Sequence, residues 1–292
     1  MHSAHFDGSF AGWRDTARAL LRQGLAPHQV NWRGDGDRGG LFDQAPSPVN
    51  TTPAAEAPRI PRQLLALLQS AACFRVEDRW SLLYRILWRV AQGDRAAMLP
   101  GDIDGSQLHK RLKAVRREAH HLHAFVRFHP RPEHAEGPHL VAWHEPAHDI
   151  LHSASEHFAE RLGRSTWLIA TPDDGIYWDG QHLHYQRPCP DEWQRLAQTP
   201  EDNGQALWLA YYGSTFNPAR LNRSALENSL PVRFWKNLPE GPLIPQLMSQ
   251  ARAGAQRDGQ AAAVAQQAGK SIRRSAAKVP QVSENVDPDH PR

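Results

Sequence analysis

The chain has 292 residues, of which 40% are hydrophobic and 8% aromatic, a composition typical of a globular protein with a buried core. No apolar run reaches the roughly 20 residues of a membrane span, and the first residues lack the features of a signal peptide, so a cytoplasmic protein is expected. The net charge of +3 is unevenly spread: residues 61–130 hold 12 basic and 6 acidic groups, whereas residues 131–250 hold 9 and 15. This division predicts either a surface for a polyanion or two halves that pack through complementary charge.

The first segment predicts a strand, a turn at Asp7 and Gly8, and a helix for which Ser9 is the N-cap. Apolar residues recur at helical spacing at Phe10, Trp13, Ala17, Leu20 and Leu21. Residues 28–32 predict a second strand. Residues 33–58 are rich in Gly, Asp, Pro, Ser and Thr and predict a long mobile loop. Residues 61–93 have the apolar period of two core helices.

A basic helix is the centre of the predicted fold. One apolar stripe contains Leu108, Leu112, Val115 and Ala119. The opposite face collects Lys110, Arg111, Lys113, Arg116 and Arg117. Residues 122–128 alternate between apolar and polar side chains and predict a strand with Arg127 on its outer face, and residues 139–145 predict its hairpin partner. Pro146 fits the first position of a following helix, where no N–H donor is needed.

The remaining pattern completes an α+β fold. Residues 165–188 alternate and are interrupted twice by Asp-Gly, which predicts a meander of three short strands. The C-terminal third has helical spacing, and residues 251–292 predict a frayed helix followed by a disordered tail. The expected fold is therefore α+β, with helices packed on a small antiparallel sheet in one main domain over residues 1–250.

Five segments together resemble one bacterial family, in the order in which that family has them. They are HFDGSFAGW (5–13), AVRREAHHLHAFVRF (114–128), VAWHEPAHDIL (141–151), YYGSTFNPARLN (211–222) and RFWKNLPE (233–240). The family consists of DNA-metabolism or DNA-repair proteins built on a domain of unknown function. The resemblance implies a radical-SAM DNA-modification or repair protein as partner, and some similar proteins carry a fused uracil-DNA-glycosylase-like domain. Cys73 and Cys189 are too few for an iron–sulfur cluster, so the radical-SAM reaction is not expected here. No glycosylase-like segment is recognised after Ala251, so the glycosylase reaction is not expected either.

Residues 144–148, HEPAH, have the letters of the HExxH zinc-protease motif, in which two histidines project from one face of a continuous helix. Pro146 contradicts such a helix, because it lacks an N–H and its ring clashes with the preceding turn. A second ligand set has residue types that suit zinc, manganese or iron and positions that match the family's motifs: His120, His123, Glu145 and His148. Structural positions are the favoured alternative for these residues, so no metal or other cofactor is predicted.

Two polar sets are candidates for nucleic-acid binding. The first is the basic face with the adjoining strand residue, namely Lys110, Lys113, Arg116, Arg117 and Arg127. Such a row supplies phosphate contacts, which give affinity and salt dependence without sequence readout. The second set contains side chains that contact base edges or phosphates in other proteins, namely Asn217, Arg220 and Lys236. Solvated helix faces and helix caps are the alternatives for both sets.

The predicted function is a nucleic-acid-binding component of a DNA-repair or DNA-metabolism system that acts with a radical-SAM enzyme or a uracil-DNA glycosylase. The binding class rests on the basic helix, and the repair context rests on the resemblance. Two alternatives stay open. One is a metal-dependent enzyme that acts on DNA through the His/Glu set. The other is a protein adaptor whose acidic half binds a partner without direct DNA contact.

Overall fold

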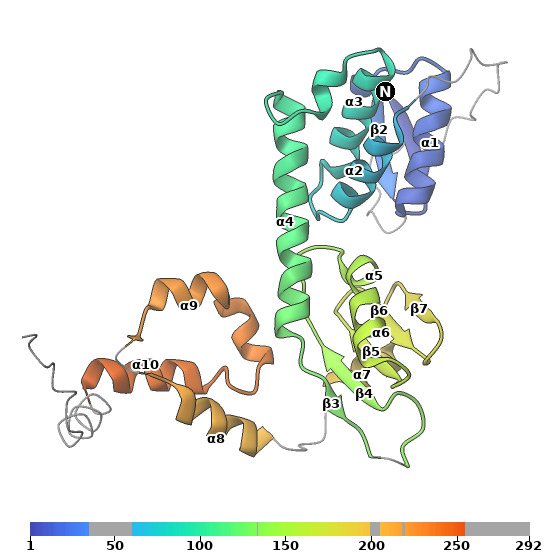
Figure 1. Ribbon diagram of the computed structural model, residues 1–292. Coiled ribbons are helices and arrows are strands. Elements are labelled where there is room, and N and C mark those ends of the chain that lie inside the picture. Colours follow the sequence, from blue (N-terminus) through green and yellow to red (C-terminus); the bar gives the residue numbers. More distant parts are fainter. Residues whose placement is uncertain (35–59, 133, 199–204, 218–219, 255–292) are drawn as a thin grey trace, which may run out of the picture.

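The computed structural model describes residues 1–34, 60–132, 134–198, 205–217 and 220–254. Its helices and small sheet confirm the predicted α+β class. One long helix, α4 (Ile103–Phe125), runs between two lobes, and the C-terminal helices lie beside its lower end (Figure 1). The loop predicted over residues 33–58 and the tail predicted over residues 251–292 lie largely outside the described residues.

The N-terminal lobe packs helices on a two-stranded parallel sheet. The strands are β1 (His2–Phe6) and β2 (Val30–Gly34), the helices are α1 (Phe10–Arg22), α2 (Arg62–Ala72) and α3 (Arg79–Ala91), and the short 3-10 helices are η1 (Pro27–Gln29) and η2 (Arg95–Met98). The Ser9 hydroxyl accepts the N–H of Gly12 at 3.0 Å, which confirms the predicted cap. The ring of Trp13 lies 5.8 Å from that of Trp32 and 5.9 Å from that of Trp80, so three indoles fill the core.

The first N–H groups of helix α4 are hydrogen-bonded by its N-cap residue, and the helix ends later in the chain than predicted. Asp102 accepts the N–H of Asp104 at 2.9 Å and that of Gly105 at 3.2 Å, which satisfies donors that have no partner within the helix. The helix runs to Phe125, so the strand predicted over residues 122–128 is wrong. Leu122 is fully buried on the continuing helical stripe, and this packing outweighs the local alternation of apolar and polar residues.

The second lobe contains a five-stranded sheet in the order β3 (His129–Pro130), β4 (Leu140–Trp143), β5 (Trp167–Ala170), β6 (Gly175–Trp178) and β7 (Leu183–Gln186). The meander β5–β6–β7 is antiparallel, as predicted. Strand β4 pairs antiparallel with β3, and not with the strand predicted over residues 122–128. Strands β4 and β5 run parallel, so the sheet is mixed rather than purely antiparallel. The crossover that a parallel pair requires passes through α5 (Leu151–Ala154) and α6 (Glu156–Leu162). These helices and α4 cover one face, and α7 (Asp191–Gln198) packs on the other.

The segment between β4 and α5 is a loop rather than the predicted start of a helix. Residues 144–150 have no helical structure, and α5 begins only at Leu151. The N–H of Ala147 donates to Glu118 at 2.7 Å, and the N–H of Asp149 donates to the carbonyl of Cys73 at 2.8 Å. These long-range bonds satisfy two N–H groups of the loop and hold it against α4 and the end of α2, which overrides the local preference of Pro146 for a first helical turn.

The C-terminal third is helical, as predicted, with α8 (Gln205–Thr215), α9 (Arg223–Ser229), the 3-10 helix η4 (Val232–Asn237) and α10 (Leu243–Ala253). The side chain of Asn222 caps α9 by accepting the N–H of Ala225 at 3.0 Å. Phe234 of η4 is buried beside α4, where its ring lies 5.5 Å from that of Phe125. None of the described helices combines the length and the apolar composition that a membrane crossing requires.

Candidate nucleic-acid interface

Helix α4 presents a row of basic side chains to solvent. Lys110, Lys113, Arg116 and Arg117 are exposed, and none of them has an ion-pair partner among the described residues. At a rise of about 1.5 Å per residue the row covers about 10 Å. One strand of duplex DNA places about three phosphates in that length of its axis. The row therefore has the charge and the length to contact several phosphates.

The inward face of the same helix carries charges that are paired. Asp104 and Arg111 are 5% and 7% exposed. Asp104 accepts from Nε of Arg85 at 2.8 Å and from Nη1 of Arg89 at 2.9 Å, while Arg111 donates to Asp78 at 2.7 Å. These arginines neutralise carboxylates of the N-terminal lobe and its junction with α4. They contribute to the internal packing of the protein rather than to the exposed row.

Glu118 is the centre of a buried charged cluster between α4, the 144–150 loop and η4. It is 3% exposed, accepts the N–H of Ala147 at 2.7 Å and forms an ion pair with Arg233. Nδ1 of His121 lies 3.5 Å from the same carboxylate. Burial raises the pKa of Glu118, but the Ala147 N–H and the Arg233 guanidinium together hold that pKa below its usual value. The ionised carboxylate thus ties three segments together.

His144 is the first residue after β4 and is buried in the same cluster. It is 3% exposed, and its ring stacks on that of Phe234 with the centroids 5.3 Å apart and an interplanar angle of 18°. Its Nε2 has no hydrogen-bond partner in the described structure. Burial lowers the pKa of His144 to about 4, because desolvation disfavours the imidazolium form. At neutral pH the ring is therefore an uncharged stacking partner.

Glu145 and Lys236 lie in contact at the outer edge of this cluster. The Glu145 carboxylate accepts from Nε1 of Trp143 at 3.0 Å and from Nδ2 of Asn237 at 3.3 Å, and it forms an ion pair with Lys236. The Lys236 side chain is 62% exposed, so it reaches solvent although a carboxylate offsets its charge. Glu145, a candidate metal ligand, and Lys236, a candidate DNA-binding residue, thus form an ion pair with each other.

Arg127 does not extend the basic row along a strand, as the sequence predicted. It follows the C-terminal end of α4, where its Nη2 donates to Oε1 of Glu240 at 3.0 Å. Glu240 is 2% exposed. The position predicted for Arg127 was wrong because it depended on a strand over residues 122–128. Since the helix continues to Phe125, the Arg127 side chain instead reaches Glu240, between η4 and α10. Its charge is offset by a buried carboxylate, unlike the charges of the exposed row.

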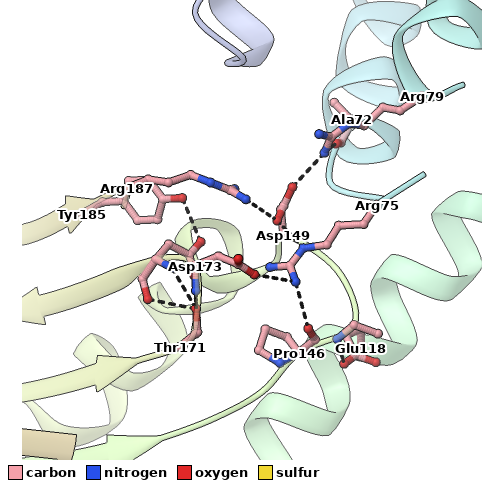
Figure 2. Close-up of polar contacts among 12 residues, drawn as sticks. Ala72, Arg75, Arg79, Glu118, Pro146, Asp149, Thr171, Asp173, Tyr185 and Arg187 are labelled. Carbon is pink, nitrogen blue, oxygen red and sulfur yellow. Dashed lines mark hydrogen bonds and ion pairs between the residues drawn. The ribbon is translucent and has the colours of Figure 1, made fainter. Parts of the chain in front are cut away.

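Asp149 binds three arginines that come from both lobes (Figure 2). Arg75 lies between α2 and α3, Arg79 begins α3, and Arg187 follows β7. Their donors lie 2.6, 2.7 and 3.0 Å from the Asp149 carboxylate, respectively, and Arg75 also pairs with Asp173 at 2.7 Å. Burial raises the pKa of Asp149, but the arginines hold it below its usual value. This carboxylate joins the N-terminal lobe to the sheet.

The four metal-ligand candidates have different surroundings. His120 is exposed beside the basic row, and His123 donates from Nε2 to the carbonyl of Ala154 at 2.8 Å. His148 lies in the loop with its ring 4.3 Å from that of Phe74, and Glu145 pairs with Lys236 as described above. No group of three or more His, Cys, Asp or Glu side chains in the described part of the chain is placed to hold a metal ion.

The HEPAH segment does not form the zinc-protease arrangement. Because residues 144–150 form a loop, His144 and His148 do not project from one helical face. His144 packs on Phe234, whereas His148 packs on Phe74. The objection raised by Pro146 is thus confirmed, although the segment is a loop throughout rather than a strand followed directly by a helix.

Two members of the second polar set, Asn217 and Arg220, precede α9, whereas Lys236 lies in η4. The carbonyl of Asn217 accepts the N–H of Arg220 at 3.1 Å, and the Arg220 side chain is exposed. Residues 218–219 lie outside the described residues, and the helix cap in this stretch is Asn222, at the start of α9. Nε1 of Trp235, next to Lys236, donates to the carbonyl of Leu230 at 3.0 Å, so this indole has a structural contact.

Three segments that carry the resemblance converge on the buried cluster, through Glu118 of α4, His144 of the loop and Arg233 of η4. A family model described as a domain of unknown function, DUF4130, matches residues 77–240, which is more than half of the chain. The chain belongs to the DUF4130 family. Searches of curated proteins and of solved structures gave no match. In this DUF4130 protein the matched region contains the exposed row and the Glu118 cluster, whereas Arg75 lies just before it.

Sequence reasoning missed Glu118 and Asp149 as organising residues of the DUF4130 domain. Glu118 follows Val115 by three residues and precedes Leu122 by four, which places it near the buried stripe, and this spacing is a signal that could have found it. No local pattern could have joined Asp149 to Arg75, because 74 residues separate them. That contact depends on the packing of the two lobes.

Proposed function

We propose that this DUF4130 protein is a nucleic-acid-binding component of a DNA-repair or DNA-metabolism system, and that the exposed row of α4 binds the phosphate backbone. One observation carries the proposal. Lys110, Lys113, Arg116 and Arg117 are exposed without an ion-pair partner among the described residues, on a helix whose inward charges are paired. Four cations close together on one helix repel one another, and a polyanion removes that repulsion while it releases its own counterions.

The proposed contacts are to phosphates rather than to bases. Lysine and arginine on an exposed helix face supply charge and donors to a backbone, which gives affinity without sequence preference. Arg220 and Lys236 are exposed candidates for further contacts in the C-terminal third. Lys236 is expected to contribute less, because Glu145 already offsets its charge.

The repair context of this proposal rests on the sequence resemblance. That resemblance supports a radical-SAM enzyme or a uracil-DNA-glycosylase-like protein as the partner that performs the reaction. The excess of acidic groups in residues 131–250, 15 against 9 basic, is compatible with a protein partner on that half of the chain. DNA binding through α4 and partner binding through the acidic half would then use different surfaces.

The test measures binding of labelled DNA by the wild-type protein and by the Lys113→Ala, Arg116→Ala, Arg117→Ala triple variant over a series of salt concentrations. We expect tight binding at low salt that weakens steeply as salt is added. The slope of log affinity against log salt should fall in magnitude by about one for each phosphate contact removed, hence by up to about three in the variant.

A matched control removes the same number of charges from another exposed helix. Helix α1, near the start of the chain and far from α4 in sequence, has three exposed arginines: Arg14, Arg18 and Arg22. Their triple alanine variant should keep nearly the whole salt slope. Equal losses in both variants would show that only the net charge matters, and an unchanged slope in the α4 variant would contradict the proposal.

The two alternatives give different results in the same experiments. A metal-dependent enzyme acting through His120, His123, Glu145 and His148 should bind a stoichiometric metal ion, yet these side chains have separate surroundings in the structure. An adaptor should bind its protein partner while the purified protein shows no salt-sensitive affinity for DNA. The unpaired row on α4 favours direct DNA binding over both.

A further inference from the structure

Two exposed aromatic rings lie side by side on α8. Trp208 is 39% exposed and Tyr211 is 58% exposed, and their ring centroids lie 5.8 Å apart at an interplanar angle of 39°. Single exposed apolar residues are common on proteins, but adjacent exposed rings form a surface to which a flat ligand can bind. Figure 1 shows α8 below the lower end of α4.

A buried carboxylate fixes the orientation of the Trp208 ring. Nε1 of Trp208 donates to Oε2 of Glu240 at 2.9 Å, and the other oxygen of Glu240 accepts from Arg127. The guanidinium carbon of Arg127 lies 6.0 Å from the Trp208 ring centroid. The polar edge of the indole is therefore satisfied within the protein while part of the ring stays in solvent. A ring that is ordered before binding loses little conformational entropy when a ligand stacks on it.

We propose that Trp208 and Tyr211 form a stacking platform for unpaired bases of single-stranded DNA. This inference rests on the proposed function and specifies its substrate class. Every nucleobase has a flat π face, so aromatic side chains bind single strands without regard to sequence while basic groups follow the backbone. In duplex DNA those faces are covered by neighbouring base pairs, so the platform favours single strands.

The position of the platform fits a strand that also contacts α4. Arg117 lies about 12 Å before the C-terminal end of that helix, at about 1.5 Å per residue. Arg127 follows that end and lies against the Trp208 ring. A backbone bound by the exposed row and continued along the helix reaches the C-terminal end of α4 after about four nucleotides at a stacked spacing of about 3.4 Å, and Arg127 lies against the Trp208 ring just beyond that end.

The size of the surface favours a base over a protein partner. A stable protein interface buries about 800 Å² on each side. Two aromatic side chains supply about 150–250 Å² each when fully covered, and Trp208 and Tyr211 are already partly buried. The exposed area is therefore closer to that of one or two bases than to that of a folded protein.

The experiment uses the full chain and two labelled single-stranded oligonucleotides of about 15 nucleotides, within the range of single-strand site sizes. One strand carries its bases, and the other is abasic at its internal positions, so that both present the same phosphates. We expect wild-type protein to bind the strand with bases roughly 5- to 150-fold more tightly for each stacked base. Tyr211→Ala and Trp208→Ala should remove most of this preference and leave the salt slope unchanged.

Two matched variants control for other effects. Tyr211→Phe keeps the ring and should bind as the wild type does. Leu99→Ala removes a side chain that is 59% exposed in the N-terminal lobe and should not change the preference. Because Trp208 also contacts Glu240, urea unfolding checks that the Trp208 variant is folded, and the more exposed Tyr211 position carries the test if it is not.

The two proposals fail in different ways. Equal wild-type affinity for the two strands, with salt-sensitive binding that the α4 triple variant loses, would overturn the platform and leave the proposed function standing. The absence of binding to either strand at low salt would overturn both. A preference for bases that persists in both Tyr211→Ala and Trp208→Ala would place stacking elsewhere and overturn the assignment to α8.

Discussion

Charged side chains on the two faces of α4 have opposite surroundings. On the inward face, Arg111 and Glu118 are 7% and 3% exposed and paired with Asp78 and Arg233, which belong to other elements. On the outward face, the basic row is exposed and has no ion-pair partner in the described structure. Charge on the inward face joins segments of the chain, whereas charge on the outward face forms the surface proposed to bind DNA. Substitutions on the inward face should therefore lower the stability of the fold, whereas substitutions on the outward face should lower the affinity for DNA.

Glu118→Ala should have the largest effect on stability. The substitution leaves Arg233 and the N–H of Ala147 without their acceptor and removes the link between α4, the loop and η4. We expect the free energy of unfolding to fall by about 3 kcal/mol, near the lower end for a broken buried ion pair because Arg233 is partly exposed. Urea unfolding monitored by circular dichroism measures the change.

The control for Glu118 is Glu227, which pairs with Arg223 one helical turn away on α9. This pair is largely exposed, so Glu227→Ala should cost about 0.5 kcal/mol or less. Comparable losses in the two variants would contradict the view that the inward charges organise the domain.

The pH dependence of stability should reveal the buried His144. Its pKa is about 4 in the folded protein and about 6.5 when unfolded, so the unfolded state binds more protons between these values. The contribution of neutral His144 to the free energy of unfolding is therefore fully present above about pH 6.5. It is lost as the pH falls toward 4, by up to about 3 kcal/mol. His144→Phe keeps an aromatic ring on Phe234 and should be less sensitive to pH in this window.

Unfolding of wild type and His144→Phe at pH 7 and pH 4.5 measures this difference. Glu118 and Asp149 also lose stabilisation in acid, because their folded pKa values are lowered, but they do so mainly below their unfolded values of about 4. If both proteins lose the same stability between pH 7 and pH 4.5, then His144 is not the group that titrates there.

The sequence predicted local structure better than it predicted the surroundings of the charges. The cap at Ser9 and the meander of β5, β6 and β7 follow from short-range patterns, and both are confirmed. The strand at residues 122–128 failed because the alternation there is also compatible with a helix, and burial of Leu122 decided between the two. Glu118, Glu145 and Arg127 each form an ion pair with a residue at 233–240, 91 or more positions along the chain.

Candidate residues for binding were partly recognisable for the same reason. The basic row is a local periodic pattern, and the structure shows it exposed as one set. Lys236 was chosen by residue type and Arg127 by its place on a predicted strand, and a tertiary contact gives each of them a carboxylate partner. An ion pair between distant segments cannot be read from spacing, so residue type alone overestimates the number of free charges.

Lys236→Ala should have a small effect on stability. Its ion pair with Glu145 lies at the outer edge of the cluster, and the lysine side chain is 62% exposed, so solvent screens the attraction. We expect a loss of about 0–1 kcal/mol, and Glu145 retains its bonds to Trp143 and Asn237. Thermal unfolding at low and high salt measures it, and a loss comparable with that of Glu118→Ala would show that the edge is as important as the buried centre.

The Lys113→Ala, Arg116→Ala, Arg117→Ala variant should lose no stability and should gain slightly at low salt. Like charges three and four residues apart on a helix destabilise it by about 0.2–0.5 kcal/mol for each pair. Alanine also has a higher helix propensity, but that gain does not depend on salt. The difference between the gains at low and at high salt therefore isolates the repulsion, and thermal unfolding measures it. A loss of stability would show that the outward charges have intramolecular partners after all, and would remove the contrast on which DNA binding through α4 is proposed.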